Sequence, residues 1–223
     1  MTPMSTSMQP AALLGLGLLL GLRHAADPDH VVAIGAIAAR TRRLWPAMQL
    51  GIVWGLGHTL TLFTVASGII LFNWVVPPRL GLGMEFCVAI ALVIVGFVNI
   101  RSHRHDHVQS SGAGGPRRAF LVGLVHGLAG SAAVALLVVA TVRDSLWASA
   151  YLLLFGAGTL VGMTLITTGL AWPVAMAAHQ WRGGDRVVRI ATGGLSVAMG
   201  VWLVYQIGWS DGLFLATPTW TPH

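Results

Sequence analysis

The sequence contains no lysine, a single cysteine and few charged residues of any kind. All 13 basic residues are arginine. Without lysine, the chain lacks both the phosphate-binding lysine of a Walker A loop and a lysine for Schiff-base chemistry. A P-loop ATPase and lysine-based covalent catalysis are therefore excluded. Cys87 alone cannot form an intramolecular disulfide or a cysteine cluster for zinc or iron–sulfur, and we expect it to be a small buried hydrophobe.

Charge is scarce along the whole chain. Only 9% of the residues are charged, whereas a soluble domain has about a quarter. Hydrophobic residues make up 55% of the sequence, and the mean hydropathy is +0.75. Apolar runs of roughly 20 residues recur, which is typical of a polytopic helical membrane protein. The net charge of +6 would suit nucleic acid, but the arginines lie in short loops between apolar runs, where membrane topology explains them.

The apolar runs predict an all-α membrane protein with six membrane helices in a single integral membrane domain, residues 1–223. The predicted helices are residues 10–39, 46–73, 83–101, 119–142, 146–171 and 187–209. Residues 11–22 have the length of a signal-peptide core. No basic side chain precedes them, however, and apolar character resumes past the polar interruption, so we interpret them as part of the first membrane helix.

Arginines are unevenly distributed among the connections. Ten lie in the first, third and fifth connections with their flanks, and two lie in the second and fourth. Because short arginine-rich loops stay in the cytoplasm, we expect loops 40–45, 102–118 and 173–186 to be cytoplasmic. Both termini are then outside, and the protein is a multi-pass protein of the cell membrane, the inner membrane of a cell that has two.

A weak internal repeat is present. The letters G-L-R-H at residues 21–24 resemble G-L-V-H at 123–126, and W-G-L-G-H-T-L at 54–60 resembles F-G-A-G-T-L at 155–160. With an odd number of helices in each half, the two halves must have opposite orientations in the membrane. Inverted repeats of this kind are a transporter architecture, with the substrate site near the midplane at broken helices.

The two halves of this repeat are residues 10–101 and 119–209, joined by loop 102–118. The loop is rich in serine and glycine, which is typical of a flexible linker. It also contains three closely spaced histidines: His103, His105 and His107. They are candidates for a cytoplasmic metal acceptor, although a solvated polar loop explains them equally well.

Five ionisable residues lie within residues 23–30 of the first apolar segment. At 1.5 Å per residue, residue 24 is roughly 20 Å along a helix from residue 11, so the group lies deep in the membrane. A charged side chain at the bilayer centre costs about 3 kcal/mol on insertion scales. Such a group persists only if its members pair with one another or bind something, and the alternative to binding is a polar network that holds helices together.

Pro28 is expected to interrupt the helix at this depth. Proline has no N–H and clashes with the carbonyl four residues earlier, so the helix should kink at Asp27-Pro28-Asp29 and free the carbonyl of residue 24. An unwound turn there brings His24, Asp29 and His30 towards one point. Arg23 is expected to act as the counter-ion of the aspartates.

Imidazole and carboxylate groups together suggest a divalent transition metal such as nickel, cobalt, copper or zinc, and the absence of thiolates disfavours Cu(I). His58 lies about 18 Å into the second segment and is a further deep candidate. The alternative for a single histidine at this depth is a packing role. The predicted metal residues are His24, Asp29, His30 and His58, with Asp27 and His126 in support.

Residues 23–31, R-H-A-A-D-P-D-H-V, resemble the signature of the nickel/cobalt transporter (NiCoT) family, R-H-A-x-D-A-D-H-I. Pro28 replaces the usual alanine. The resemblance implies that His24, Asp29 and His30 recognise the metal. The G-L-G-H-T stretch around His58 is similar to a second element of the family, and residues 127–131 resemble the smaller urease-accessory-type relatives.

Residues and resemblance together predict a permease for Ni²⁺, with Co²⁺ as a second substrate, that is not an enzyme and needs no cofactor. Efflux by the same fold is an alternative that the sequence leaves open. An intramembrane metalloenzyme using the same cluster is another, although the H-E-x-x-H motif is missing. A third is a b-type haem protein with His58 and His126 as axial ligands.

Overall fold

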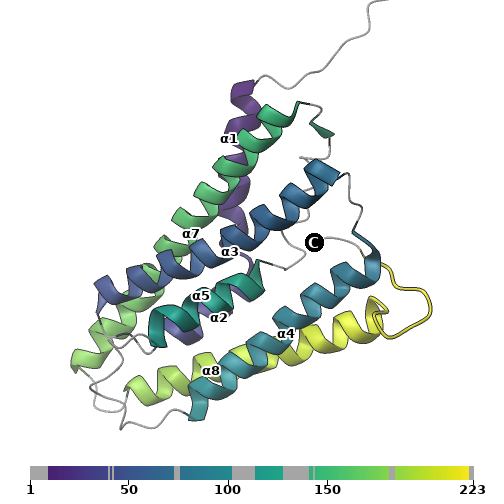
Figure 1. Cartoon of the computed structure of the whole chain (residues 1–223). Helices are drawn as coiled ribbons and strands as arrows, with labels where there is room; N and C mark the ends of the chain where they lie inside the picture. The colour runs from purple at the N-terminus through teal and green to yellow at the C-terminus, as the bar shows by residue number, and fades with distance from the viewer. Residues whose placement is uncertain are drawn as a thin grey trace, which may run out of the picture.

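The computed structural model describes residues 10–39, 41, 43–72, 76–101, 114–127, 141–142, 144–180 and 184–220. These residues form α-helices and one short π-helix, with no strand among them, as expected for an all-α membrane protein. In chain order the elements are α1 (Pro10–His24), α2 (Pro28–Ala38), α3 (Leu44–Phe72), α4 (Pro78–Arg101), α5 (Gly114–His126), α7 (Ser145–Gln180), α8 (Gly184–Tyr205) and the π-helix η2 (Gln206–Ser210) (Figure 1).

Four of the described helices are long and apolar enough to cross a membrane. Their membrane-crossing parts are Leu44–Gly68, Pro78–Arg101, Ser145–Pro173 and Arg186–Ser210. The first predicted segment, residues 10–39, consists of the two shorter apolar helices α1 and α2. The fourth predicted segment begins earlier than expected, at Gly114, and is described as far as residue 127 and at residues 141–142.

The fifth predicted segment, residues 146–171, agrees with the membrane-crossing part Ser145–Pro173, but the loop predicted from residue 173 is wrong. Helix α7 continues through Pro173 to Gln180, so residues 173–180 are helical rather than loop. A proline removes one backbone donor, and membrane helices tolerate this loss.

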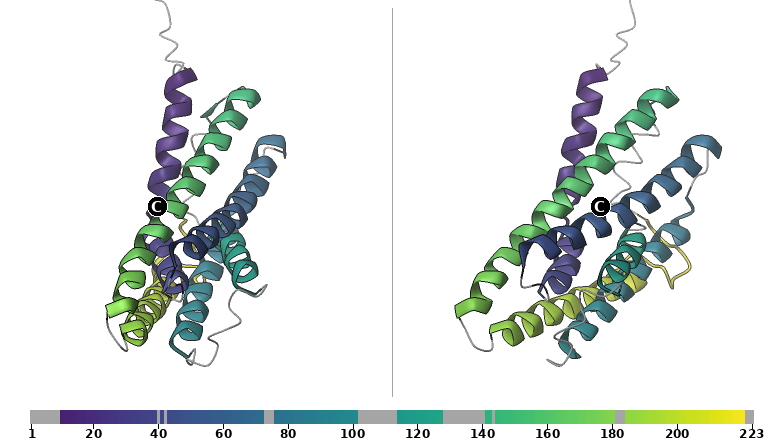
Figure 2. Two further views of the ribbon diagram at one scale, coloured as in Figure 1. Left: turned by 90° about the vertical axis from the view of Figure 1, so that its left-hand side faces the viewer. Right: turned by 60° about the vertical axis from the view of Figure 1, so that its left-hand side comes forward.

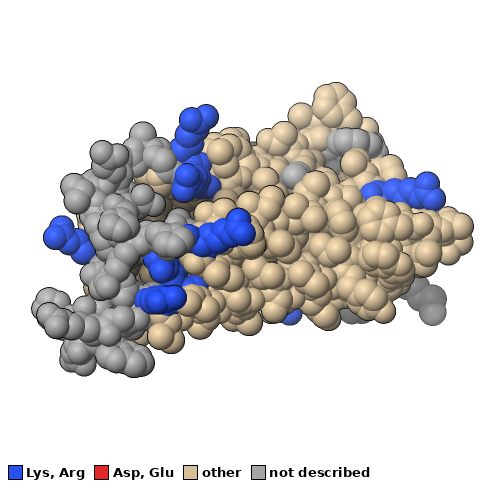
Figure 3. Space-filling model, turned by 90° about the horizontal axis from the view of Figure 1, so that it is seen from below, with Lys and Arg blue, Asp and Glu red and all other residues tan. Residues whose placement is uncertain are grey.

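The outer surface is apolar over most of its length. Cys87, expected to be buried, is exposed instead. It shares the outer face of α4 with Ile90, Ile94 and Phe97, which follow it at helical spacing and are also exposed. Figure 3 shows most of the basic side chains at one end of the molecule, a further one at the opposite end, and a broad band with little charge between them. In a membrane, such an apolar band is in contact with the hydrocarbon of the lipids rather than with water.

Close helix contacts define how the helices run relative to one another. Gly17 faces Tyr151 and Gly21 faces Phe155, so α1 and α7 are parallel. Helix α5 is likewise parallel to α3, because residues later in α5 meet residues later in α3. Helices α3 and α7 are antiparallel, because Gly51 meets Thr167 whereas residue 55, further along α3, meets residue 160, earlier in α7. Figures 1 and 2 show α1 beside α7, α5 beside α3, and α4 beside α8.

The two halves of the chain make reciprocal contacts across this arrangement. Gly21 of α1 packs against the carbonyl oxygen of Phe155 in α7, and Gly123 of α5 packs against the carbonyl oxygen of Trp54 in α3. The first helix of each half therefore packs on the central helix of the other half. A second reciprocal pair is Gly158 against Leu18 and Gly57 against Phe120. Small residues allow this close approach of helices in a membrane.

The α4–α8 pair repeats the pattern with hydrogen bonds. The side-chain amide of Asn99 donates to the carbonyl of Arg189 at 3.2 Å, and the hydroxyl of Ser196 donates to the carbonyl of Leu92 at 2.8 Å. The two donors, at 99 and 196, are 97 residues apart in the sequence, and so are the two acceptors, at 92 and 189. The internal repeat of the sequence thus corresponds to a pseudo-twofold relation in the structure.

The direction of this pseudo-twofold axis follows from α3 and α7. The operation exchanges these two helices, and they are antiparallel neighbours. The axis therefore crosses the helices rather than running along them. For helices that span a membrane, such an axis lies in the membrane plane, which is the geometry of an inverted repeat.

Candidate metal site

The break in the first segment places two histidines close together in space. Helix α1 ends at His24 and α2 begins at Pro28, which occupies the first helical position, where its missing N–H costs nothing. The expected free carbonyl of residue 24 is not present, because it accepts a hydrogen bond from the backbone N–H of Asp27 at 3.1 Å. The chain separates into two helices joined by a hydrogen-bonded turn, rather than kinking within one helix.

His24 bridges this turn to the second membrane segment. It is buried, and its Nδ1 lies 2.9 Å from a carboxylate oxygen of Asp27. Its Nε2 lies 3.0 Å from Nε2 of His58, 34 residues later in α3. Both ring nitrogens of His24 therefore have partners: a carboxylate behind the ring and a second imidazole in front of it.

His30 has the same kind of support in the first turn of α2. Its Nδ1 lies 3.0 Å from a carboxylate oxygen of Asp29, and the residue is fully buried. Asp29 also lies where a helix favours a negative charge, near the amino end of α2. Nε2 of His30 has no hydrogen-bond partner among the described residues.

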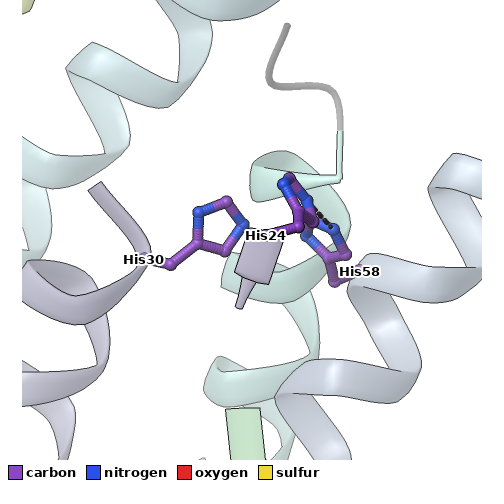
Figure 4. Close-up of side chains that lie close together, drawn as sticks. All are labelled: His24, His30 and His58. Carbon is purple, nitrogen blue, oxygen red and sulfur yellow. Dashed lines mark hydrogen bonds between the residues drawn. The ribbon is translucent and has the colours of Figure 1, made fainter. Parts of the chain in front are cut away.

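The rings of His24, His30 and His58 converge from three helices (Figure 4). Their centres are 4.7 Å apart for His24 and His30, and 5.0 Å apart for each of the other two pairs. One ring nitrogen from each residue lies within 4.8 Å of the other two. Asp27, Asp29 and His30 form a second group that meets the same limit. Three predicted residues thus meet at one point, and two predicted carboxylates lie beside it.

His126, the remaining predicted residue, lies at the edge of this group. It is the last residue of α5 and is fully buried, and its Nδ1 is 3.3 Å from the carbonyl oxygen of Val122. Its ring centre is 5.6 Å from that of His30. It is not a member of the three-histidine group.

Trp54 is a site residue that the sequence did not single out. It is buried, and its ring centre lies 5.6 Å from His30, 5.6 Å from His126 and 6.4 Å from His58. The available signal was its position four residues before His58, on the same face of a helix. With Trp54 and His30 against both His58 and His126, no space remains between those two histidines for a flat haem, so the geometry disfavours bis-histidine haem binding.

Several buried polar atoms around this point lack a hydrogen-bond partner among the described residues. They are His30 Nε2, His58 Nδ1, Thr59 Oγ1, His126 Nε2 and Trp54 Nε1. Each unsatisfied buried donor or acceptor costs about 1–3 kcal/mol. A concentration of such atoms in one place is what a polar ligand or a hydrated ion satisfies.

Two expectations about charged residues have different outcomes. Arg23 does not serve as a counter-ion, because its side chain is exposed and forms no ion pair with either aspartate in the described structure. The aspartates pair instead with the site histidines.

The loop histidines at 103, 105 and 107 lie outside the described residues, so their acceptor role stays a prediction.

Comparisons with known proteins identify the family of this chain. Residues 11–104, which contain the break and His58, match the family described as "High-affinity nickel-transport protein" (NicO). The urease accessory protein UreH of Bacillus sp. (strain TB-90) is 36% identical over 217 residues, covering 91% of this chain and 95% of the relative. No solved structure matches.

The apolar helices and the family match define a multi-pass membrane protein of a nickel-transport family. Within that class, the chain belongs to the nickel/cobalt transporter family, in the branch of the urease accessory protein UreH.

Proposed function

We propose that this protein is a permease that carries Ni²⁺ through the three-histidine site, with Co²⁺ as a second substrate. The observation that carries the proposal is the convergence of His24, His30 and His58, with ring nitrogens within 4.8 Å of one another in the protein interior. A hydrated dication cannot enter hydrocarbon, so fixed ligands must replace its water shell. Imidazole nitrogens suit nickel and cobalt in this role.

Ring separations support a shared ion. Two imidazoles that bind one metal at about 2.1 Å place their ring centres about 4.6 to 6.5 Å apart, depending on the ligand angle. The three observed separations, 4.7, 5.0 and 5.0 Å, lie within this range. The two Nε2 atoms of His24 and His58 are 3.0 Å apart, which corresponds to an angle of about 90° at the ion, as in octahedral or square-planar coordination.

Asp27 and Asp29 act behind the imidazoles in this proposal. Each carboxylate faces Nδ1 of one histidine, and Nε2 is left for the ion. This is the carboxylate–histidine–metal arrangement, which holds the ring orientation and raises the basicity of the ligand. The two carboxylates also balance the charge of a dication at a depth where an unbalanced charge is expensive.

The membrane potential supplies the driving force for uptake. It contributes about 2.3 kcal/mol per charge per 100 mV, and therefore about 4.6 kcal/mol for a dication. The arginine-rich loops 40–45 and 102–118 and the arginine-rich connection between α7 and α8 lie in the cytoplasm, both termini lie outside, and the inside-negative potential draws Ni²⁺ inward. We infer that the chain acts as one membrane domain, since each half packs on the central helix of the other.

Radioactive nickel flux in proteoliposomes tests the proposal. The parent protein is compared with His24→Ala and His30→Ala at an imposed inside-negative potential. Thr167→Val is the matched control, because Thr167 is fully buried but its hydroxyl bonds only within its own helix, to Met163. The histidine variants should lose about tenfold or more of the flux, and the control should keep it. Folded histidine variants that move nickel at the parental rate would overturn the proposal.

A further inference from the structure

We propose that His30 and His126 form a second, inner metal station that receives the ion from the three-histidine site. This inference rests on the proposed function, since it assigns a second stop to the same ion. The two stations share His30, so the ion moves from a site with His24 and His58 to a site with His126 without losing all of its protein ligands.

The first support is the state of the two nitrogens. Nε2 of His30 and Nε2 of His126 are both buried and have no hydrogen-bond partner among the described residues. Each ring is oriented through its other nitrogen, His30 by Asp29 and His126 by the carbonyl of Val122. The ring centres are 5.6 Å apart, within the range of about 4.6 to 6.5 Å for two imidazoles on one ion.

The second support is the internal repeat. His126 is the last residue of α5, as His24 is the last residue of α1. The ring of His24 lies 5.4 Å from Phe155, and the ring of His126 lies 5.6 Å from Trp54, its counterpart in the other half. The pseudo-twofold relation therefore places His126 where His24 stands in the first half.

The inverted orientation gives the two positions opposite access. Helix α1 approaches the centre from one side of the membrane and α5 approaches it from the other. Both helices reach the centre with their carboxyl ends, which carry the negative end of the helix dipole and favour a cation. The outer station lies at the end of α1, and the inner station lies at the end of α5.

Trp54 completes the passage between the stations. Its ring contacts both His30 and His126, and its Nε1–H is buried with no partner among the described residues. An N–H donor cannot ligate a metal ion, but it can donate to a water molecule that remains on the ion. The indole thus supports a partly hydrated ion during the transfer.

The repeat is asymmetric in a way that favours release. The counterpart of His58 is Thr159, whose hydroxyl donates to its own helix at the carbonyl of Phe155, 2.9 Å away. The inner station therefore has two imidazoles and the outer station has three. Transport needs a site strong enough to capture the ion and a weaker one from which the ion can leave.

Equilibrium Ni²⁺ binding and Ni²⁺ flux, measured on the same full-length preparations, test the proposal. His126→Ala and His126→Asn are compared with the parent, with His24→Ala and with the control Thr167→Val. The His126 variants should bind Ni²⁺ within about threefold of the parental affinity but lose about tenfold or more of the flux, because capture remains and transfer is lost. His24→Ala should lose both.

Two outcomes would overturn the inner station. One is a folded His126 variant with flux within about twofold of the parent, a factor worth less than 0.5 kcal/mol. The other is a loss of Ni²⁺ binding as large as that of His24→Ala, which would make His126 a ligand of the first site. If His126→Ala aggregates, His126→Asn, which keeps a polar group of similar size, decides by the same criteria. Parental binding and flux in His24→Ala would instead refute the proposed function.

Discussion

His24 and His126 occupy equivalent positions in the two halves of the chain. Each ends a helix, and each places its ring against the aromatic residue that the other half supplies at the matching position: Phe155 at 5.4 Å for His24, and Trp54 at 5.6 Å for His126. Two half-helices from opposite sides thus bring a histidine each to the centre of the protein.

The carboxylates should matter for affinity through the imidazoles that they orient. Asp27→Asn and Asp29→Asn keep the size of the side chain but remove the charge that fixes the proton on Nδ1. We expect each to weaken Ni²⁺ binding by about 10- to 100-fold, the usual effect of losing such a partner. Asp144→Asn is the control, since Asp144 accepts from the backbone N–H of Leu146 at 2.8 Å at the start of α7, and asparagine caps a helix equally well. Unchanged affinity in both site variants would contradict the assigned role.

The close helix contacts should be sensitive to a single methyl group. A Cβ on Gly21 would meet the carbonyl of Phe155, and one on Gly123 would meet the carbonyl of Trp54, so the helices would have to separate. We expect Gly21→Ala and Gly123→Ala each to destabilise the protein by about 1–3 kcal/mol and to lower its melting temperature in detergent.

Gly15→Ala provides the control for this pair, because nothing lies within 4 Å of a Cβ at that position of α1. It should melt at or above the parental temperature, as alanine favours a helix over glycine by about 1 kcal/mol. Similar melting of Gly15→Ala and Gly21→Ala would show that the packing of α1 on α7 is wrong.

Nickel binding should weaken in acid. A protonated imidazole has no lone pair for a metal, so protons compete with Ni²⁺ for the same nitrogens. Lowering the pH therefore lowers the affinity of the protein for Ni²⁺. From pH 7 to pH 5 we expect a loss of about tenfold or more, since histidine normally titrates near 6.5. Titration of the purified protein with Ni²⁺ at several pH values measures the affinity, and an affinity independent of pH would contradict the expected competition between protons and Ni²⁺.

The orientation in the membrane can be tested with single cysteines. Cys87 is exposed on α4, so it is first replaced in Cys87→Ala, and then Ser5→Cys or Ser110→Cys is added. A membrane-impermeant maleimide applied to intact cells should label Ser5→Cys, because the amino terminus is predicted to lie outside. Ser110→Cys, in the arginine-rich third connection, should react only after permeabilisation. The opposite pattern would reverse the predicted topology.

Much of the architecture was predictable from local composition. Apolar runs indicated the membrane helices, because the length of such a run reflects the thickness of the bilayer. Asp27-Pro28-Asp29 indicated the break, since proline cannot continue a helix without losing a bond. The end of α7 was missed, because a membrane helix can continue through a proline such as Pro173.

The partners of individual atoms were not predictable in the same way. The carbonyl of residue 24 was expected to be free, but the turn itself satisfies it through Asp27. Arg23 was expected to pair with the aspartates, but the histidines do so. These outcomes depend on the direction in which each side chain leaves a short turn, which composition and spacing do not specify.

The amino-acid sequence alone was sufficient to predict a membrane protein with a polar break in its first segment, a twofold repeat and a set of candidate ligands. These features depend on hydropathy, backbone sterics and residue chemistry. Packing decided which ligands meet. His58 reaches His24 from 34 residues away, and Trp54 comes to lie beside both His30 and His126, because glycine contacts draw the helices of the two halves together. Such meetings between distant parts of the chain follow only from how complete helices fit together in three dimensions.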